Sequence, residues 1–251
     1  MKIIGVIPAR YNSSRLPGKP LADICGKPMI WWVYNQVKKV KGLNEVYVAT
    51  DDQRIVQKCI ELDINYLITS NNHPNHIYRV QEVSEILHAD YYVCINGDEP
   101  IIEPEVIDKM VCLVNQKSKN KDKQVFGLMR YLKNPAETVD FSNIKVVTSS
   151  NGDALYMSRS PIPYPKGTLS FRYKKYIGVE GFNKEALDFY VSTPSCELET
   201  IEDIDHLRFL ENDIKIKYSL VESNSLSVDT KKDLEEVRLI ISKRARGNLY
   251  E

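Results

Sequence analysis

The sequence predicts an α/β protein with a doubly wound, mostly parallel sheet and an antiparallel extension. Through the first half of the chain, short apolar runs rich in β-branched and aromatic residues alternate with longer helical patterns, which is typical of βα units. In the second half, strand-like runs are separated by loops that contain proline and glycine. The 251 residues are 43% hydrophobic and 27% charged, a composition typical of a globular protein.

The elements of the first half follow from these runs in order. The first run, IIGVIP, is short and almost wholly apolar, which predicts a buried strand. Pro104 stands where a proline commonly starts a helix, and Asp63 follows the end of another predicted helix. We expect strands over 3–8, 45–50, 65–69 and 91–96, and helices over 29–40, 53–62, 78–88 and 103–115.

The second half predicts a different arrangement of elements. We expect strands over 125–131, 145–148, 154–157, 176–179 and 215–221, and helices over 184–191, 201–212 and 233–242. The polar stretch 117–123 is explained as a solvated loop. There is no repeat and no low-complexity linker, so residues 1–251 are expected to form a single domain.

The charge balance excludes several classes of partner. Lys and Arg total 34, as do Asp and Glu, so no basic excess indicates a nucleic-acid partner. No stretch approaches the roughly 20 apolar residues of a membrane span. The N-terminal run is shorter than a signal-peptide core, and the five cysteines are scattered without a CxxC pair. We therefore expect a reduced, cytoplasmic protein with no membrane partner and no structural zinc.

A cationic loop follows the first predicted strand. Arg10, Arg15 and Lys19 lie within ten residues punctuated by proline and glycine, with no acidic residue among them. Ligands of open parallel sheets bind beyond the carboxyl ends of the strands, and fixed cations there suit a polyphosphate. The Walker A spacing is absent. Three solvated surface charges are the less favoured alternative.

Two acidic residues are candidate ligands of Mg²⁺. Asp98 follows Asn96 and Gly97 at the carboxyl end of the fourth strand, and Asp229 precedes the last predicted helix. Each also has a structural explanation, because Gly-Asp is common in turns and Asp229 or Thr230 is suited to cap the helix. Together with the cationic loop, Asp98 predicts a nucleotide–Mg²⁺ site, whereas spacing alone leaves Asp229 evenly balanced between a helix cap and a second metal ligand.

Seven segments, in order, carry a family resemblance over about residues 2–237. They are IPARYNSSRLPGKPLADICGKPMI, VATDD, INGDEPIIEPEVI, SRSPIPYP, YIGVEGF, LETIEDIDHLRFLENDIKI and SVDTKKDLEEV. In these segments the chain resembles the 3-deoxy-manno-octulosonate (Kdo) cytidylyltransferases, or CMP-Kdo synthetases. The first segment is shared with wider sugar nucleotidyltransferases, whereas LExxE…LR followed by VDTxxDLE is more specific.

The resemblance implies a Rossmann-like, GT-A-like nucleotidyltransferase fold and a reaction without a covalent enzyme intermediate. An acidic sugar attacks the α-phosphorus of CTP and displaces pyrophosphate, with Mg²⁺ as cofactor, for lipopolysaccharide or capsule synthesis. It also implies a homodimer, a nucleotide-binding half over 1–120 and an acceptor-binding and dimerisation half over 121–251. A nucleotidyltransferase using UTP or dTTP, or a phosphorylated acceptor, is the alternative; a non-catalytic homologue and a glycosyltransferase are less favoured.

The resemblance also assigns residue roles. Those implied as catalytic are Arg10, Lys19, Asp98 and Asp229, of which Asp98 and Asp229 bind the metal. The implied nucleotide contacts are Pro8, Ala9, Arg10, Arg15, Lys19, Arg79 and Asp98. The implied acceptor contacts are Asn96, Arg159, Tyr176, Glu180, Glu199 and Glu202.

The chain departs from the family pattern mainly at the acceptor. The family's His-x-Ser-Gly-Thr-x-Arg is His73-Pro-Asn-His76-Ile-Tyr-Arg79 here, its Gln-Gly-Asp-Glu-Pro begins with Asn96, and its His-Ile-Gly-Ile-Tyr is YIGVE, residues 176–180. Lost amide and imidazole groups leave a bound sugar's polar groups unpaired, which favours a different acceptor over neutral drift. We expect a surface-polysaccharide sugar acid, or one that bears an amine or another modification.

Two further features have more than one interpretation. His73 and His76 have the spacing of a metal site, but no carboxylate or cysteine lies near them in the sequence, which favours loop histidines or a nucleotide contact. Trp31 and Trp32 are adjacent on a predicted helix and so point in different directions. Core and dimer packing is therefore favoured over a base-stacking platform.

Overall fold

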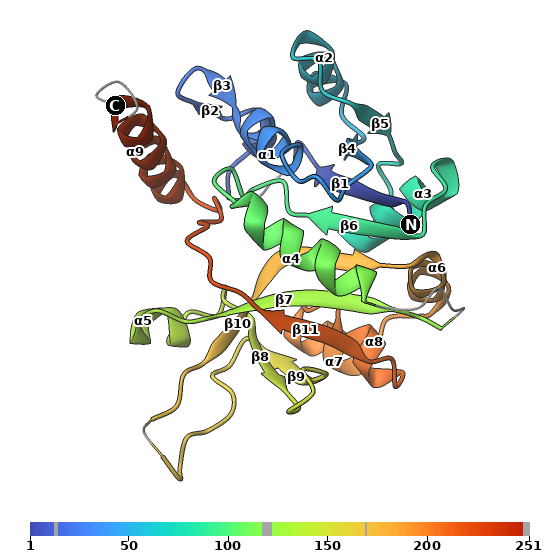
Figure 1. Ribbon diagram of the computed structural model, residues 1–251, viewed down its shortest axis with the longest axis vertical. Coiled ribbons are helices and arrows are strands. Elements are labelled where there is room, and N and C mark those ends of the chain that lie inside the picture. The colour runs from blue at the N-terminus through green and yellow to red at the C-terminus, as the bar shows by residue number, and fades with distance from the viewer. Residues whose placement is uncertain (13–14, 117–121, 169, 248–251) are drawn as a thin grey trace.

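The computed structural model describes residues 1–12, 15–116, 122–168 and 170–247, and in that part of the chain a nine-stranded mixed sheet forms the centre of the molecule (Figure 1). The order along the sheet is β11-β7-β10-β6-β1-β4-β5, and β8 and β9 extend it from β10. The strands are β1 Ile3–Ala9, β4 Glu45–Thr50, β5 Tyr66–Ile68, β6 Tyr91–Ile95, β7 Val125–Tyr131, β8 Lys145–Thr148, β9 Ala154–Ser158, β10 Lys174–Phe182 and β11 Ile216–Leu220. Strands β2 Asp23–Ile24 and β3 Lys27–Pro28 form a separate hairpin.

Strand β1 lies between two parallel neighbours. Ile4 pairs with Glu45 of β4 and with Tyr92 of β6. The carboxyl ends of these strands, at Ala9, Thr50 and Ile95, therefore meet at one edge of the sheet. The loops that follow β1 and β6 start from this edge. The cationic loop and Asp98, which lie in these two loops, are therefore close together, as predicted.

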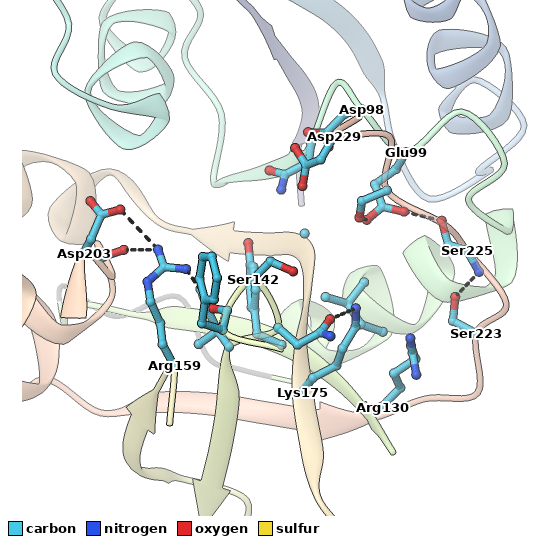
Figure 2. Close-up of a pocket in the computed structure, with 18 of the residues that line it drawn as sticks. Asp98, Glu99, Arg130, Ser142, Arg159, Lys175, Asp203, Ser223, Ser225 and Asp229 are labelled. Atoms are coloured by element: carbon cyan, nitrogen blue, oxygen red, sulfur yellow. Dashed lines mark hydrogen bonds and ion pairs between the residues drawn. The ribbon is translucent and has the colours of Figure 1, made fainter. Parts of the chain in front are cut away.

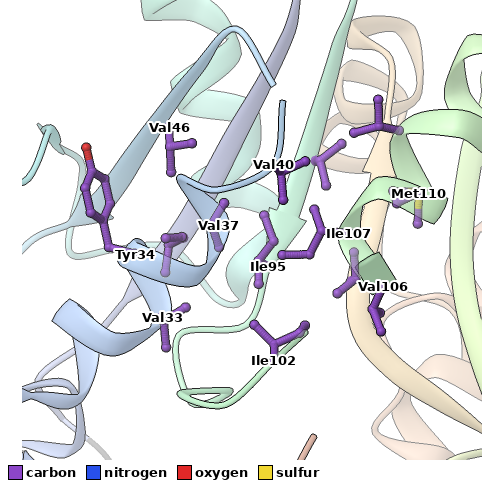
Figure 3. Close-up of a cluster of buried hydrophobic side chains, with 14 of the residues drawn as sticks. Val33, Tyr34, Val37, Val40, Val46, Ile95, Ile102, Val106, Ile107 and Met110 are labelled. Atoms are coloured by element: carbon purple, nitrogen blue, oxygen red, sulfur yellow. The ribbon is translucent and has the colours of Figure 1, made fainter. Parts of the chain in front are cut away.

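Helices cover both faces of the sheet. They are α1 Met29–Val37, α2 Gln53–Glu61, α3 His76–Ile86, α4 Pro104–Asn115, α5 Pro135–Val139, α6 Lys184–Ser192, α7 Glu197–Glu202, α8 Leu207–Glu211 and α9 Lys231–Gly247, with a 3-10 turn η1 at Lys19–Leu21. One face packs α1, α2 and α4 against the strands, and Figure 3 shows Val37 of α1 and Ile107 of α4 meeting beside Ile95 of β6. The other face packs α3, α6 and α8, through residues such as Val80 and Leu187. This confirms the predicted fold class.

Strand β10 is antiparallel and lies inside the main sheet. It pairs with β6 on one side and β7 on the other, with a register shift between Ile177 and Glu180. Because it runs opposite to β6, its early residues Tyr176 and Gly178 lie at the edge where β6 ends. The antiparallel part of the fold therefore forms one wall of the site.

Several predicted boundaries differ from the structure. The helix predicted over 78–88 begins at His76, because the Asn75 side chain caps it by accepting from the Ile77 and Tyr78 amides. The helix predicted over 201–212 is two helices, α7 and α8, because Asp203 adopts a left-handed conformation (φ 52°) that ends α7. The strand predicted over 176–179 spans Lys174–Phe182, and the helix over 233–242 spans Lys231–Gly247.

Three further observations concern regions singled out in the sequence. Residues 117–121 of the predicted solvated loop lie outside the described residues. Trp31 and Trp32 pack edge-on to each other against the apolar clusters and do not form a stacking platform. In the described part of the chain, we find no helix with the length and apolar character needed to cross a membrane.

Candidate functional site

Two adjoining pockets open at the carboxyl edge of the sheet. The smaller, of about 410 Å³, is lined by Pro8 and Ala9 at the end of β1 and by the loop after it, which begins at Arg10. The larger, of about 700 Å³, is lined by the start of β10, the strand-to-helix loop after β6 and the segment before α9 (Figure 2). Arg15, Asn96 and Asp98 line both. The two pockets therefore meet at these side chains.

Backbone and side-chain contacts hold the described parts of the cationic loop, residues 10–12 and 15–19. The Gly18 amide donates to the Tyr11 carbonyl at 2.9 Å, and Gly18 adopts φ 70°, which glycine takes without strain. This turn leads directly into η1 and directs Lys19 toward Asp98. The Arg54 guanidinium stacks on the Tyr11 ring, 3.2 Å from its centroid, and supports the loop from α2.

Lys19, Asp98 and Asp229 form an ion-paired cluster where the pockets meet. The Lys19 ammonium lies 2.6 Å from Asp98 Oδ2 and 3.2 Å from Asp229 Oδ1. Burial alone lowers the pKa of Lys19, but the two carboxylates outweigh this and the pKa is raised. Arg15 adds a second cation 2.9 Å from Asp229 Oδ1. The structure thus brings together three of the four residues predicted to be catalytic.

The donor set of this cluster fits a hard divalent cation. Mg²⁺ is commonly held by one or two carboxylates together with substrate phosphates, and here two carboxylates converge from distant segments. The Lys19 ammonium lies between them and already occupies a position that favours positive charge. Asp98 and Asp229 would hold the ion, and Lys19 would then be freed toward the phosphates.

The other predicted nucleotide contacts are placed differently. Arg10 lines the smaller pocket, and its guanidinium donates to the His73 carbonyl at 2.6 Å, which joins the cationic loop to the loop before α3. Arg79, by contrast, is fully buried and bonds Asp51 at 2.7 Å and the Thr69 hydroxyl. Burial lowers the pKa of Arg79, partly offset by Asp51. The structure therefore places Arg79 behind the pocket as a support for the β4 and β5 ends.

Of the predicted acceptor contacts, Asn96, Arg159 and Tyr176 line the larger pocket. The Arg159 guanidinium is largely occupied by carbonyls, since it donates to those of Glu202 at 2.6 Å and Asp203 at 2.7 Å. The Glu202 carboxylate accepts from the Arg159 amide and the Ser158 hydroxyl, so Glu202 fixes Arg159 from behind.

Glu199 is removed from the pockets. Its carboxylate forms a buried pair with Arg208, with two bonds of 2.7 Å, and accepts from Tyr190. In this structure the predicted acceptor residue Glu199 joins α7 to α8.

Glu180 is fully buried and connects the walls of both pockets. Its carboxylate accepts from the Tyr176 hydroxyl, which belongs to the larger pocket, and lies 2.9 Å from His76 Nε2, which belongs to the smaller one. His76 Nδ1 lies 3.4 Å from Asp205. Burial raises the pKa of Glu180, but His76 and His206 outweigh it and lower the pKa to about 2. Burial likewise lowers the pKa of His76, yet Glu180 and Asp205 raise it to about 10.

The folded chain thus supplies the carboxylate and the cysteine that the sequence around His76 lacks. Donor atoms of His76, Cys94 and Glu180 lie within 4.8 Å of one another, the grouping of a possible metal site. In this structure the His76 imidazole pairs with the Glu180 carboxylate, so two of these three groups already bind each other. His73, in contrast, remains in the loop and pairs with Glu82.

Sequence analysis missed several residues of the larger pocket. They are Glu99, Arg130, Ser142, Asn143, Lys175, Ser223, Ser225 and Ser227. Lys175 lies beside Arg130, and burial, with that like charge, lowers the pKa of Lys175. The alternation of serines in SNSLSVD was the available signal, because alternate residues of an extended segment face one side.

Comparison with known proteins gives consistent similarities. A family model described as "Cytidylyltransferase" matches residues 4–216. The chain is 41% identical to a 3-deoxy-manno-octulosonate cytidylyltransferase of Fusobacterium nucleatum, covering 94% of this chain and 96% of that protein. It is 35% identical to an 8-amino-3,8-dideoxy-manno-octulosonate cytidylyltransferase of Shewanella pealeana, covering 96% of this chain and 100% of that protein.

A solved structure gives the same picture. CMP:2-keto-3-deoxy-manno-octonic acid synthetase, complexed with CTP, superposes with a TM-score of 0.91 at 38% identity, covering 97% of this chain and 100% of that one. The family model matches residues 4–216, a range that includes the β1 loop, Asp98 and the β10 wall, and the sequence relatives match over most of the chain. The chain therefore belongs to the cytidylyltransferase family and, within it, to the Kdo cytidylyltransferases.

Proposed function

We propose that this protein transfers CMP from CTP to an acidic sugar of the Kdo type and releases pyrophosphate. The Lys19–Asp98–Asp229 cluster, at the junction of the two pockets, is the observation that carries the proposal. A nucleotide in the smaller pocket would present its α-phosphorus at this junction, and an acceptor in the larger pocket would present its hydroxyl there. Relatives and a solved structure with CTP support the reaction class.

The proposed reaction needs positioning and charge neutralisation. The acceptor hydroxyl attacks the α-phosphorus, the new O–P bond forms, the bond to the β-phosphate oxygen breaks, and the hydroxyl proton is released. Arg10, Arg15 and Lys19 would bind the triphosphate and neutralise the charge that moves onto pyrophosphate. Mg²⁺, held by Asp98 and Asp229, would supply further neutralisation and orientation. Asn96 would contact both substrates, because it lines both pockets.

We further propose that the acceptor differs from unmodified Kdo. His76 and Glu180 stand where the family pattern has glycine and tyrosine, and here they bind each other across the wall between the pockets. Asn96 is one methylene shorter than the family's glutamine. A sugar would therefore meet a tyrosine already bound to Glu180. Among relatives, names with an 8-amino sugar acid occur beside names with Kdo itself.

A pyrophosphate-release assay tests both proposals. CTP, UTP, dTTP and ATP are each supplied with Mg²⁺ and with Kdo, 8-amino-3,8-dideoxy-manno-octulosonate or a sugar phosphate. We expect CTP to be preferred, and the modified sugar acid to give a higher kcat/KM than Kdo. Preference for UTP or dTTP would contradict the assignment of CTP as the nucleotide. Equal or better use of Kdo would contradict only the second proposal, that the acceptor differs from unmodified Kdo.

The protein is further proposed to be a homodimer. Several large apolar side chains of the second half are strongly exposed, namely Val139, Phe141, Leu155, Tyr164 and Ile201. Burial of such side chains between two copies of the chain would remove apolar surface from water, which favours association. We also propose a cytoplasmic location and a product used for lipopolysaccharide or capsule assembly.

A further inference from the structure

Asp98 and Asp229 reach the same point from segments far apart in the sequence. Asp98 follows β6, whereas Asp229 ends the extended segment 223–229, here called the serine strap, which precedes α9. The strap belongs to no strand, so sheet pairing does not fix its position. The Val221 amide donates to the Met129 carbonyl, and the Val228 amide donates to the Asp98 carbonyl at 2.9 Å. Between these two backbone bonds, side chains must hold the strap.

The strap has two faces with different partners. Leu226 and Val228 pack into the apolar cluster with Leu16, Met29 and the α9 residue Leu234. Ser223, Ser225 and Ser227 line the larger pocket. Figure 2 shows Ser225 beside Glu99, in the loop 98–103. This alternation is what an extended backbone produces.

Glu99 is the carboxylate on which the polar face of the strap converges. Its two oxygens accept from the Ser225 and Ser227 hydroxyls, one each, and the residue is 4% exposed. Glu99 directly follows Asp98, and Ser227 lies two residues before Asp229. The contact therefore links the backbone next to Asp98 to the backbone next to Asp229, the two proposed metal ligands.

A second carboxylate holds the far end of the strap. Glu103 accepts from the Ser223 hydroxyl and from the Asn224 amide, both at 2.8 Å. Glu103 lies outside the larger pocket, whereas Glu99 lines it. The two glutamates thus offer a matched pair, one near Asp229 and one remote from it.

We propose that Glu99 is a positioning residue that, through Ser225 and Ser227, sets Asp229 beside Asp98 and Lys19 for metal binding. This inference rests on the proposed function, because it concerns the metal site of that reaction. Each Glu99 oxygen accepts from one strap hydroxyl, so the role proposed here is to act through the strap and not as a metal ligand. Groups that orient metal ligands in this way typically contribute 10–100-fold to metal affinity or activity.

The test measures Mn²⁺ binding to the enzyme–CTP complex by electron paramagnetic resonance, together with kcat and KM for CTP and the melting temperature. For Glu99→Ala and for Ser225→Ala combined with Ser227→Ala, we expect the Mn²⁺ dissociation constant to rise roughly 10–100-fold. Glu99→Gln should stay within about threefold of wild type, because its amide accepts from one serine and donates to the other. Glu103→Ala is the matched control and should stay within about twofold.

The outcomes separate this inference from the proposed function. If Asp98→Asn loses Mn²⁺ affinity while folded Glu99→Ala or the double serine variant binds Mn²⁺ within twofold of wild type, Glu99 has no positioning role. If Asp98→Asn itself binds Mn²⁺ normally, the metal site of the proposed function is wrong. Should Glu99→Ala fail to fold, the single variants Ser225→Ala and Ser227→Ala decide the question by the same measurement.

Discussion

At the residue scale, four side chains of opposite charge meet at one point of the site. Lys19 is shared by two carboxylates, and Arg15 binds one of them, in a chain whose formal net charge is zero. The binding of a metal-bound polyphosphate depends on charges that are grouped at one point, and the net charge of the whole chain does not show this grouping. Single substitutions at this point are therefore informative.

Asp229→Asn tests the metal role most directly. The amide keeps the size of the side chain but removes the charge that faces Lys19 and Arg15. We expect kcat for CMP transfer to fall about a hundredfold or more, the typical loss when one preorganised electrostatic group is removed. Asp213→Asn, at an exposed residue that lines neither pocket, is the control and should change kcat little. Equal activity of Asp229→Asn and wild type would rule out Asp229 as a ligand.

Glu180 predicts a pH dependence of stability. The pKa of Glu180 is lowered from 4.5 to about 2, so its stabilisation is present above pH 4.5 and is lost as the pH falls toward 2. The pKa of His76 is raised from 6.5 to about 10, so its stabilisation is complete below pH 6.5 and is lost as the pH rises toward 10. The ion pair therefore contributes most between about pH 4.5 and 6.5.

Urea unfolding of wild type and Glu180→Gln across the pH range measures this effect. We expect the difference in free energy of unfolding to be largest between about pH 4.5 and 6.5 and to shrink at both extremes. His88→Gln, which removes a histidine outside this cluster, is the control. A difference that does not change with pH would show that the pair is not ionised as proposed.

At the element scale, β10 brings antiparallel backbone to the end of β6. A Cβ on Gly178 would lie 2.3–2.9 Å from Asn96 side-chain atoms, so glycine is needed for the Asn96 side chain to pack against this part of β10. On the same sheet, a Cβ on Gly127 of β7 would lie 2.4–3.0 Å from the Tyr218 ring, in the core. The two glycines resemble each other in crowding and differ in what they support.

We expect Gly178→Ala and Gly127→Ala to separate activity from stability. Gly178→Ala displaces Asn96 and should lower kcat/KM for the acceptor about 10–100-fold, with a small change in melting temperature. Gly127→Ala overpacks the core and should cost about 1–3 kcal/mol of unfolding free energy, while the folded fraction keeps its kcat/KM. The opposite assignment of effects would contradict the placement of Asn96 in the site.

The cap at the start of α3 also joins this helix to side chains from later in the chain. Asn75 caps the helix and also donates to Tyr190 and Asp205, at 2.8 and 2.7 Å. Asn75→Ala should cost about 1–2 kcal/mol of unfolding free energy, measured by urea denaturation. Asn134→Ala, which removes the cap of the short exposed helix α5, should cost less.

At the scale of the whole molecule, the proposed dimer can be measured by light scattering after size exclusion. The exposed apolar side chains predict a mass of twice the 28.9 kDa chain. Replacing Val139, which is 74% exposed, by Asp should weaken association, because a buried charge is costly at an apolar interface. A monomeric wild type at high concentration would contradict the dimer.

The sequence by itself determined the fold class, most elements and the meeting of the Lys19 loop with Asp98, whereas Asp229 was assigned through the family resemblance. Hydrophobic periodicity is local, so the alternation of strands and helices is visible without coordinates. The carboxyl-end rule then places the loops after β1 and β6 together. The precise ends of elements were harder, because the Asn75 cap and the left-handed Asp203 are single-residue effects.

Only the tertiary structure decided which predicted side chains reach the pockets. Arg79 and Glu199 carry charges typical of binding residues. Both are nevertheless buried, Arg79 paired with Asp51 and Glu199 paired with Arg208. Glu180 meets His76 from 104 residues away, a pairing that neither local sequence indicates. The reason is physical: periodicity specifies the face on which a side chain lies, whereas the partner it meets depends on how distant elements pack.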